Sequence, residues 1–177
     1  MLVNMTKGEK MSNLKNPINE IKYQNNLLAS NLLKVINYTD CFELKSQFDT
    51  IDGFTKDYFL AQPAWLRLIS FGVLQKKTLI DILKETSFQK NDSIGQWKVY
   101  GRNENEIVFG QNMGFMEYCF SFKQEDKKTL RVTTLVEYKG KMGKYYFSIV
   151  SLLHKPFVKR SLKNVLERRS KLCPTTT

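Results

Sequence analysis

The order of elements in the second half of the chain limits its fold more than any other feature. Two segments, Phe115–Lys123 and Thr129–Tyr138, have an apolar or aromatic residue at every second position, which is typical of β-strands with one buried face. Two shorter segments of this kind precede them and are joined by a polar hairpin turn: Gln96–Arg102, Glu106–Gly110 and, between them, Asn103–Asn105. A long helical segment, Lys144–Ser170, follows. We therefore expect an antiparallel sheet with one covered face and one largely polar face, packed on that helix.

The first half of the chain adds one strand and several helices. Asn37–Lys45 alternates in the same way and predicts the first strand. Phe54–Ala61 predicts a helix with Asp52 as its N-cap, and Pro63 suits the first turn of a second helix. The apolar spacing of Leu74–Thr86 continues the helical pattern up to the strands.

The last helix changes character along its length. It is apolar as far as Leu153 and increasingly basic afterwards, and Gly140 and Gly143 separate it from the last strand. Pro156 lies inside it. Because proline lacks a backbone N–H and clashes with the preceding turn, we expect it to kink or split this helix.

Length and composition favour a single domain. A chain of 177 residues with 42% hydrophobic residues can bury one good core. We expect residues 1–34 to form a partly ordered leader or arm, residues 35–170 to form the domain, and residues 171–177 to form a disordered tail. In the leader, the leucines of Gln24–Lys34 predict a helical turn or two, or a packed arm. The predicted class is α+β, with a curved antiparallel sheet wrapped around a long C-terminal helix.

Several short motifs follow one another in an order that resembles a known fold. They are Tyr38-Thr39-Asp40, Pro63-Ala64-Trp65, Gln96-Trp97-Lys98-Val99, Asn105-Glu106-Ile107-Val108-Phe109-Gly110, Thr133-Thr134-Leu135-Val136, and Met142-Gly143-Lys144-Tyr145-Tyr146 leading to His154. Across Asn37–Leu166 the chain resembles the START-like helix-grip superfamily (SRPBCC), and within it the bacterial domain-of-unknown-function family DUF 2867. That resemblance implies the helix-grip fold and no particular reaction.

A strongly bent sheet cannot lie flat on one straight helix. The space between them is therefore either filled by bulky side chains or left as a cavity, and a mostly apolar cavity with a few polar groups is typical of a small-molecule site. The residues predicted to bind a ligand there are Tyr38, Asp40, Trp97, Phe109, Tyr118, Phe120, Val132, Thr134, Val136 and Tyr138 on the sheet, and Tyr146, Val150 and His154 on the helix, with Phe147 beside them.

Three of these residues have polar or titratable groups, and each has two interpretations. His154 is the only histidine, and it is either a proton donor or acceptor at the cavity wall or a helix residue bonded to backbone or solvent. Asp40 falls on the inward phase of its strand, so it is a buried carboxylate that either anchors a ligand or makes a structural contact. Tyr38 has the same two interpretations.

No recognisable catalytic or cofactor-binding motif occurs. The chain has no G-x-S-x-G, G-x-G-x-x-G, P-loop or H-E-x-x-H sequence, and we predict no catalytic residue, metal or cofactor. Cys119 points outward on its strand, away from His154. Cys41, Cys119 and Cys173 are too far apart for a disulfide framework or a zinc cluster. With no secretory signal and no apolar run that could span a bilayer, we expect a cytoplasmic protein.

The charge is strongly positive and concentrated at the C-terminus. The formal net charge is +11, and residues 151–177 contain seven Lys or Arg against Glu167 alone. Lys155, Lys159 and Lys163 recur at four-residue spacing and form one stripe. We interpret this stripe as a solvated face near a helix C-terminus. An anionic membrane surface is an alternative, and we do not expect nucleic acid, because the nearby basic-aromatic segment lacks the pattern of an RNA-binding strand.

The predicted function is the binding of a small apolar or amphipathic ligand between the sheet and the last helix. Two alternatives stay open: an enzyme that acts on a small molecule in the same cavity with Asp40, Tyr38 or His154, and a cavity-free interaction module with a basic surface.

Overall fold

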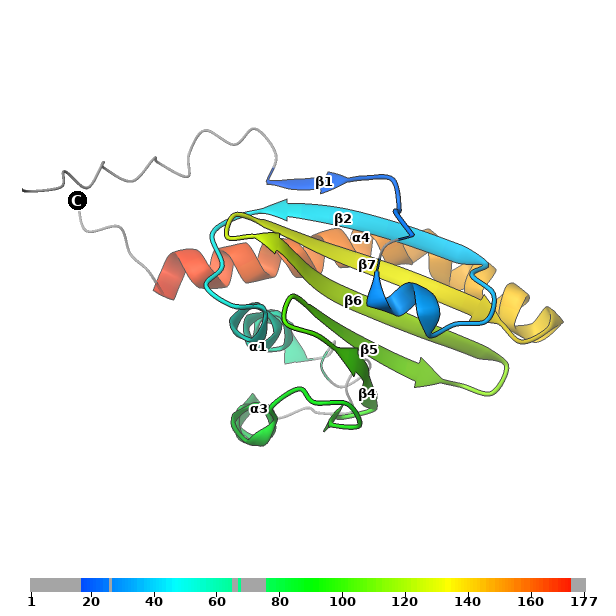
Figure 1. Ribbon diagram of the computed structural model, residues 1–177, viewed down its shortest axis with the longest axis horizontal. Helices are drawn as coiled ribbons and strands as arrows, with labels where there is room; N and C mark the ends of the chain where they lie inside the picture. The colour runs from blue at the N-terminus through cyan, green and yellow to red at the C-terminus, as the bar shows by residue number, and fades with distance from the viewer. Residues whose placement is uncertain (1–16, 26, 65–66, 68–75, 173–177) are drawn as a thin grey trace, which may run out of the picture.

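The protein is a mixed α+β structure in which one curved antiparallel sheet lies against a long C-terminal helix. The computed structural model describes residues 17–25, 27–64, 67 and 76–172. Seven strands form the sheet in the order β1-β2-β7-β6-β5-β4-β3: β1 (Ile18–Glu20), β2 (Tyr38–Lys45), β3 (Ser93–Ile94), β4 (Trp97–Arg102), β5 (Glu106–Asn112), β6 (Met116–Asp126) and β7 (Thr129–Tyr138). The helical elements are η2 (Leu28–Asn31), α1 (Ile51–Ala61), α3 (Lys76–Glu85) and α4 (Lys141–Leu172). Figure 1 shows the sheet in front of α4.

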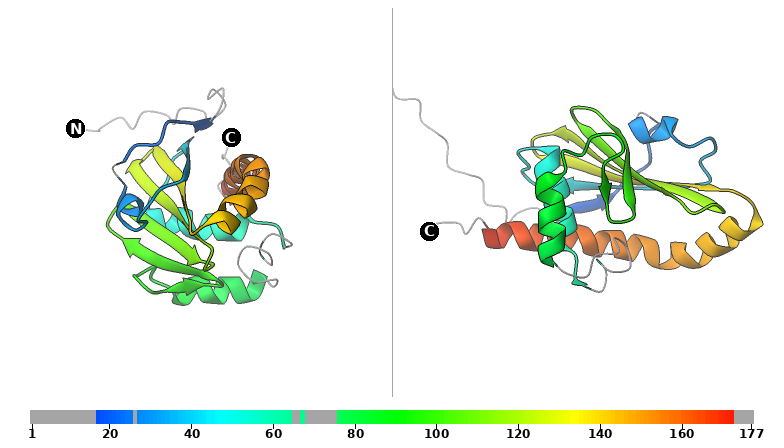
Figure 2. Two further views of the ribbon diagram at one scale, coloured as in Figure 1. Left: turned by 90° about the vertical axis from the view of Figure 1, so that its right-hand side faces the viewer. Right: turned by 90° about the horizontal axis from the view of Figure 1, so that it is seen from below.

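The predicted fold class is confirmed. The meander of four strands is present, and β7 has the predicted bounds, Thr129–Tyr138. In the view along α4, the sheet curves around the helix (Figure 2). The helix predicted to begin at Pro63 lies largely outside the described residues, as do residues 1–16 of the leader and 173–177 of the tail.

The inner face of the sheet forms the main core. Its side chains line up in rows across the paired strands, and in one row Phe42 on β2 lies opposite Val132, Val132 opposite Phe122, and Phe122 opposite Ile107. All four are buried, since alternate residues of a strand point to the same face. Phe54 and Phe59 of α1 and Val158, Leu162 and Val165 of α4 complete this cluster.

Helix α1 begins at Ile51, two residues earlier than an N-cap at Asp52 would allow. Thr50 has an extended backbone, with φ −145° and ψ 155°, and its Oγ1 accepts a hydrogen bond from the Gly53 N–H at 3.1 Å. The prediction of Asp52 as the N-cap is therefore wrong, because Asp52 already lies in the first helical turn. There its negative charge is stabilised by the positive end of the helix dipole, and its carboxylate pairs with Arg102 at 2.8 Å.

Helix α4 is one continuous element that includes Pro156, so of the two predicted outcomes, a kink or a split, the split is wrong. The first turns of the helix curve relative to the rest (Figure 2). The helix begins close against the sheet: a Cβ on Gly143 would lie 2.2 Å from the Phe115 carbonyl oxygen. Only glycine fits at this approach. Among the described residues, no helix is both long and apolar enough to cross a membrane.

The outer face of the sheet carries a second core, which corrects the prediction that this face is largely polar. Leu27, Ala29 and Leu33, from the segment around η2, pack on Val108, Cys119 and Leu135. This covering raises the pKa of the Cys119 thiol to about 12 through desolvation by burial. The leucines of the predicted arm therefore cover a second apolar surface of the sheet.

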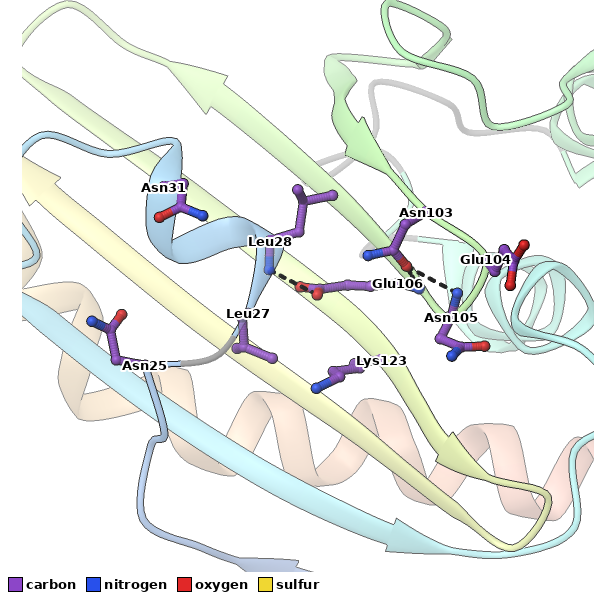
Figure 3. Close-up of a pocket in the computed structure, with 9 residues that line it drawn as sticks. All are labelled: Asn25, Leu27, Leu28, Asn31, Asn103, Glu104, Asn105, Glu106 and Lys123. Atoms are coloured by element: carbon purple, nitrogen blue, oxygen red, sulfur yellow. Dashed lines mark hydrogen bonds between the residues drawn. The ribbon is translucent and has the colours of Figure 1, made fainter.

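Backbone contacts fix the arm to the sheet. The Glu106 carboxylate is buried beneath η2 and accepts hydrogen bonds from the Leu28 N–H at 2.8 Å and from the Ser121 hydroxyl at 2.5 Å. Figure 3 shows the Glu106 side chain pointing at the Leu28 nitrogen, at the edge of a polar surface hollow. The Glu137 carboxylate accepts a further bond from the Lys34 N–H at 2.9 Å.

Strand β1, which was not predicted from the sequence, forms the edge of the sheet next to β2. It pairs with β2, and its last residue, Glu20, reaches α4. Glu20 pairs with Lys155 at 2.5 Å and with Lys159 at 3.6 Å. The hydrogen bond from Lys155 lowers the pKa of Glu20. An edge strand and the helix are thus linked directly.

We expect Glu106→Gln to loosen the arm. A neutral amide can accept from the Leu28 N–H and donate to the Ser121 hydroxyl, so both contacts lose the strength that the charge gives them, at a cost of about 1 kcal/mol in the free energy of unfolding. Chemical denaturation measures this loss. Glu104→Gln, in the adjacent exposed turn, is the matched control and should leave stability unchanged. Equal stability of the two variants would show that Glu106 does not hold η2.

Candidate functional site

A pocket of about 500 Å³ lies between the inner face of the sheet and α4. Strands β4 to β7 form one wall, the first half of α4 forms the other, and α1 closes one end. Its lining residues are Tyr58, Gln62, Gln96, Trp97, Gln111, Met113, Met116, Tyr118, Phe120, Val132, Thr134, Tyr146, Phe147, Val150, Leu153, His154, Phe157 and Val158. The volume is in the range of roughly 300–1,000 Å³ that is typical of small-molecule sites.

The pocket exists because α4 is buried against the sheet at two separate places. Near its start, Phe147 packs with Met116 and Val136 in a small cluster. Further along, Val158 and Leu162 enter the main core. The segment between these contacts, which includes Val150 and His154, lines the pocket.

One wall of the pocket is an ordered group of aromatic rings. The Trp97 ring meets the rings of Tyr118 and Phe120 edge-on, at centroid distances of 4.7 and 4.8 Å. Phe120 in turn stacks on Phe109 at 5.0 Å. Edge-to-face and offset-stacked contacts are the favoured geometries of aromatic pairs. This wall is therefore apolar, and the rings that line the pocket are closely packed against the rings behind them.

The opposite part of the pocket is polar. His154 on α4 places its Nε2 3.2 Å from Asp40 Oδ2 and 3.1 Å from Thr134 Oγ1. The Tyr38 hydroxyl donates a hydrogen bond to the same Asp40 oxygen at 2.8 Å. Asp40 and Thr134 are opposite one another on β2 and β7, so the register of two neighbouring strands creates this cluster and the helix completes it.

Burial sets the electrostatics of this cluster. The Asp40 side chain has no exposed surface, and its Oδ1 has no hydrogen-bond partner within the described residues. Burial, with the charge of Asp40 next in importance, raises the pKa of the Tyr38 phenol well above its usual value, so Tyr38 remains a hydrogen-bond donor. His154 keeps some solvent contact, with 17% of its side chain exposed. A partly accessible imidazole beside a buried carboxylate can bind a polar group or exchange a proton.

Two other lining residues have a buried polar atom without a hydrogen-bond partner in the described part of the chain. They are the Trp97 Nε1 donor and the Gln62 Oε1 acceptor. Both side chains are almost completely buried. Because an unpaired buried polar atom costs free energy, such atoms call for an explanation, and a bound ligand or water would provide one.

Comparison with known proteins identifies the family. A family model described as "Protein of unknown function (DUF2867)" matches residues 32–161, which is well over half of the chain. The protein belongs to this DUF2867 family. No curated protein and no solved structure matches the chain.

The structure of this DUF2867 protein brings together many of the predicted ligand-binding residues. Eight of them line the pocket: Trp97, Tyr118, Phe120, Val132, Thr134, Tyr146, Val150 and His154. The other five lie around it: Tyr38, Asp40, Phe109, Val136 and Tyr138. Phe109 is buried behind Phe120, Val136 and Tyr138 pack with Phe147, and Tyr38 and Asp40 lie behind Thr134 and His154.

Several residues that line the pocket were not predicted from the sequence. Tyr58 and Gln62 come from α1, whose position against the sheet no local pattern predicts. Met116 shares the inward phase of β6, and Phe157 follows His154 by three residues on α4, so strand and helix periodicity could have indicated both.

In the described part of this DUF2867 chain, no three His, Cys, Asp or Glu side chains form a group that could hold a metal ion. The Cys119 side chain packs in the outer core, on the opposite face from His154.

We expect Tyr38→Phe to destabilise the protein. The substitution removes the hydroxyl that donates to the buried Asp40 carboxylate, and a hydrogen bond to a charged group contributes about 1.5–3 kcal/mol. Because Tyr38 is only partly buried, we expect the lower end of that range in the free energy of unfolding. Tyr145→Phe, at an exposed position of α4, is the control and should have no effect. If both variants unfold alike, Asp40 does not depend on Tyr38.

Proposed function

We propose that this DUF2867 protein binds one small amphipathic molecule in the pocket between the sheet and α4. The ligand's apolar part lies against Trp97, Tyr118 and Phe120, and its polar group lies near Thr134 and His154. The observation that carries the proposal is the combination, in one pocket of about 500 Å³, of an aromatic wall with a buried carboxylate–imidazole pair at the other end. Few precisely placed polar groups in an apolar pocket are what orient small ligands.

The arrangement of the sheet and α4 also supports membership of the START-like helix-grip superfamily (SRPBCC), which we include in the proposal. The sheet follows a strongly curved path around a single helix (Figure 2). Side chains of both the sheet and the helix line the pocket. The fold supplies the space, and the residues in it determine what binds.

A cytoplasmic location is part of the same proposal. Cys41 and Cys119 are free thiols, although both are buried, which agrees with a reducing compartment.

Filling the pocket should abolish ligand binding. Val150 lines the pocket on α4, and Val150→Trp places a large ring in the ligand's space. Val35→Trp is the control, because Val35 is 55% exposed and does not line the pocket. Native mass spectrometry of protein purified from its own host should show a retained mass in the wild type and the control and none in Val150→Trp. No retained mass in the wild type, or an equal one in Val150→Trp, would contradict the proposal.

The contact between Asp40 and His154 favours a second candidate, an enzyme acting in the same pocket. A carboxylate that holds an imidazole at the edge of a pocket is an arrangement used for general acid–base catalysis. His154→Ala separates the two functions, with Ser151→Ala on the same helix as its control. A carrier should retain a ligand of the same mass in the wild type and in both variants, in a smaller amount in His154→Ala because that variant lacks one polar contact. An enzyme should accumulate unconverted substrate only in His154→Ala, seen as a bound mass that differs from the wild type by a chemical group.

A further inference from the structure

One side of α4 exposes a continuous row of large apolar side chains. It consists of Met142, Tyr145, Tyr146, Ile149, Leu152 and Leu153, which are 67%, 74%, 41%, 56%, 76% and 72% exposed. Their spacing of three, one, three, three and one residues places them on one side of the helix. We call this set the α4 apolar stripe.

Most of the stripe lies on the side of α4 that faces away from the sheet, and Tyr146 and Leu153 lie at the rim of the pocket. Buried residues of the helix, among them Gly143, Phe147 and Val158, are on the opposite side. Among the described residues, the other exposed large hydrophobic side chains are Val35 and Met113, at 55% and 36%. Scattered apolar residues on a surface are ordinary, but a continuous patch of this kind marks an interaction site.

The charged side chains of the segment that carries the stripe have a single sign. Between Tyr138 and Leu166 the sequence contains seven Lys or Arg and no Asp or Glu. Lys141 and Lys144 are exposed at the start of the helix, and Arg160 and Lys163 are exposed farther along it. None of these four takes part in an ion pair recorded among the described residues, in contrast to Lys155 and Lys159, which pair with Glu20.

We propose that the α4 apolar stripe docks on an anionic lipid membrane surface, with the helix lying in the plane of the headgroups. Apolar side chains then enter the boundary between headgroups and acyl chains, while the lysines contact the anionic headgroups. Tyr145 and Tyr146 suit this position, because tyrosine favours the membrane–water interface.

Charge and shape favour a lipid surface over a second copy of the chain. Two copies meeting through this face would bring together like charges from a protein of net charge +11, with no acidic side chain in the segment to offset them. Helix α4 forms a curved ridge on the outside of the molecule (Figure 2). Such a ridge suits a flat, deformable surface.

The stripe adjoins the pocket. Tyr146 and Leu153 belong to the stripe and also line the pocket, so a docked helix holds this part of the pocket rim close to the lipid. Docking itself does not depend on ligand binding.

Vesicle sedimentation with the full chain tests the proposal. The probes are vesicles of phosphatidylcholine alone and vesicles that also contain phosphatidylglycerol. We expect the wild type to bind the anionic vesicles and to bind neutral ones much more weakly. Ile149→Glu should weaken binding to anionic vesicles at least about tenfold, since it removes one membrane-buried apolar side chain. Lys141→Ala and Lys163→Ala should each weaken it about fivefold.

Val35→Glu is the matched control, because Val35 and Ile149 are 55% and 56% exposed and the two substitutions add the same charge. Its affinity for anionic vesicles should be within about twofold of the wild-type affinity, because the substitution changes only the net charge of the protein and leaves the stripe intact. Circular dichroism and the thermal midpoint of each variant show whether it is folded.

Three results would overturn the proposal. In the first, the wild-type protein does not prefer anionic vesicles. In the second, Ile149→Glu binds these vesicles as well as Val35→Glu does. In the third, sedimentation velocity shows a wild-type dimer that Ile149→Glu dissociates, which would assign the stripe to contact with a second copy. Val150→Trp keeps the two proposals separate, because a filled pocket should leave vesicle binding unchanged whatever its effect on the retained ligand.

Discussion

Burial of α4 against the sheet at two separate places is the constraint on which the rest of the structure depends. Phe147 forms one contact, in a cluster with Met116 and Val136, and Val158 and Leu162 form the other in the main core. A curved sheet and a helix can be in close contact only over a limited length, so between these two clusters the helix only partly contacts the strands, as where His154 reaches Thr134. The pocket occupies that space. Its position and its lining therefore follow from where the two clusters form.

The same geometry explains how a charged group can lie at the pocket wall. A carboxylate buried in an apolar wall is costly unless it is paired and hydrogen-bonded. Asp40 meets this requirement through Tyr38, from its own strand, and His154, from the helix. One oxygen of the carboxylate takes part in these contacts, while Oδ1 has no partner in the described residues. The cluster thus combines a structural role with unused hydrogen-bonding capacity.

The sequence predicted what depends on local periodicity. The alternation of Thr129–Tyr138 was sufficient for the bounds of β7 and for the inward direction of Val132 and Thr134. Features that depend on contacts between distant segments could not be predicted from local periodicity. The outer core around Val108 and Cys119 forms only because the leucine-rich arm packs on them, which their own strands do not indicate. Strand β1 has only three residues, too few to show an alternating pattern. Asp40 and His154 were recognised separately, but only the relative position of β2 and α4 brings them into contact.

The packing of the arm has a consequence for where this fold can be cut. The span shared with the family begins at residue 32 and ends at residue 161. Strand β1 and η2 lie before it, and Leu162 and Val165 of the main core lie after it. A fragment trimmed to that span would uncover apolar surface on both sides of the sheet and would leave β2 as an open edge, a site at which strands of other molecules can add. Soluble fragments for spectroscopy should therefore extend from Pro17 to Lys171.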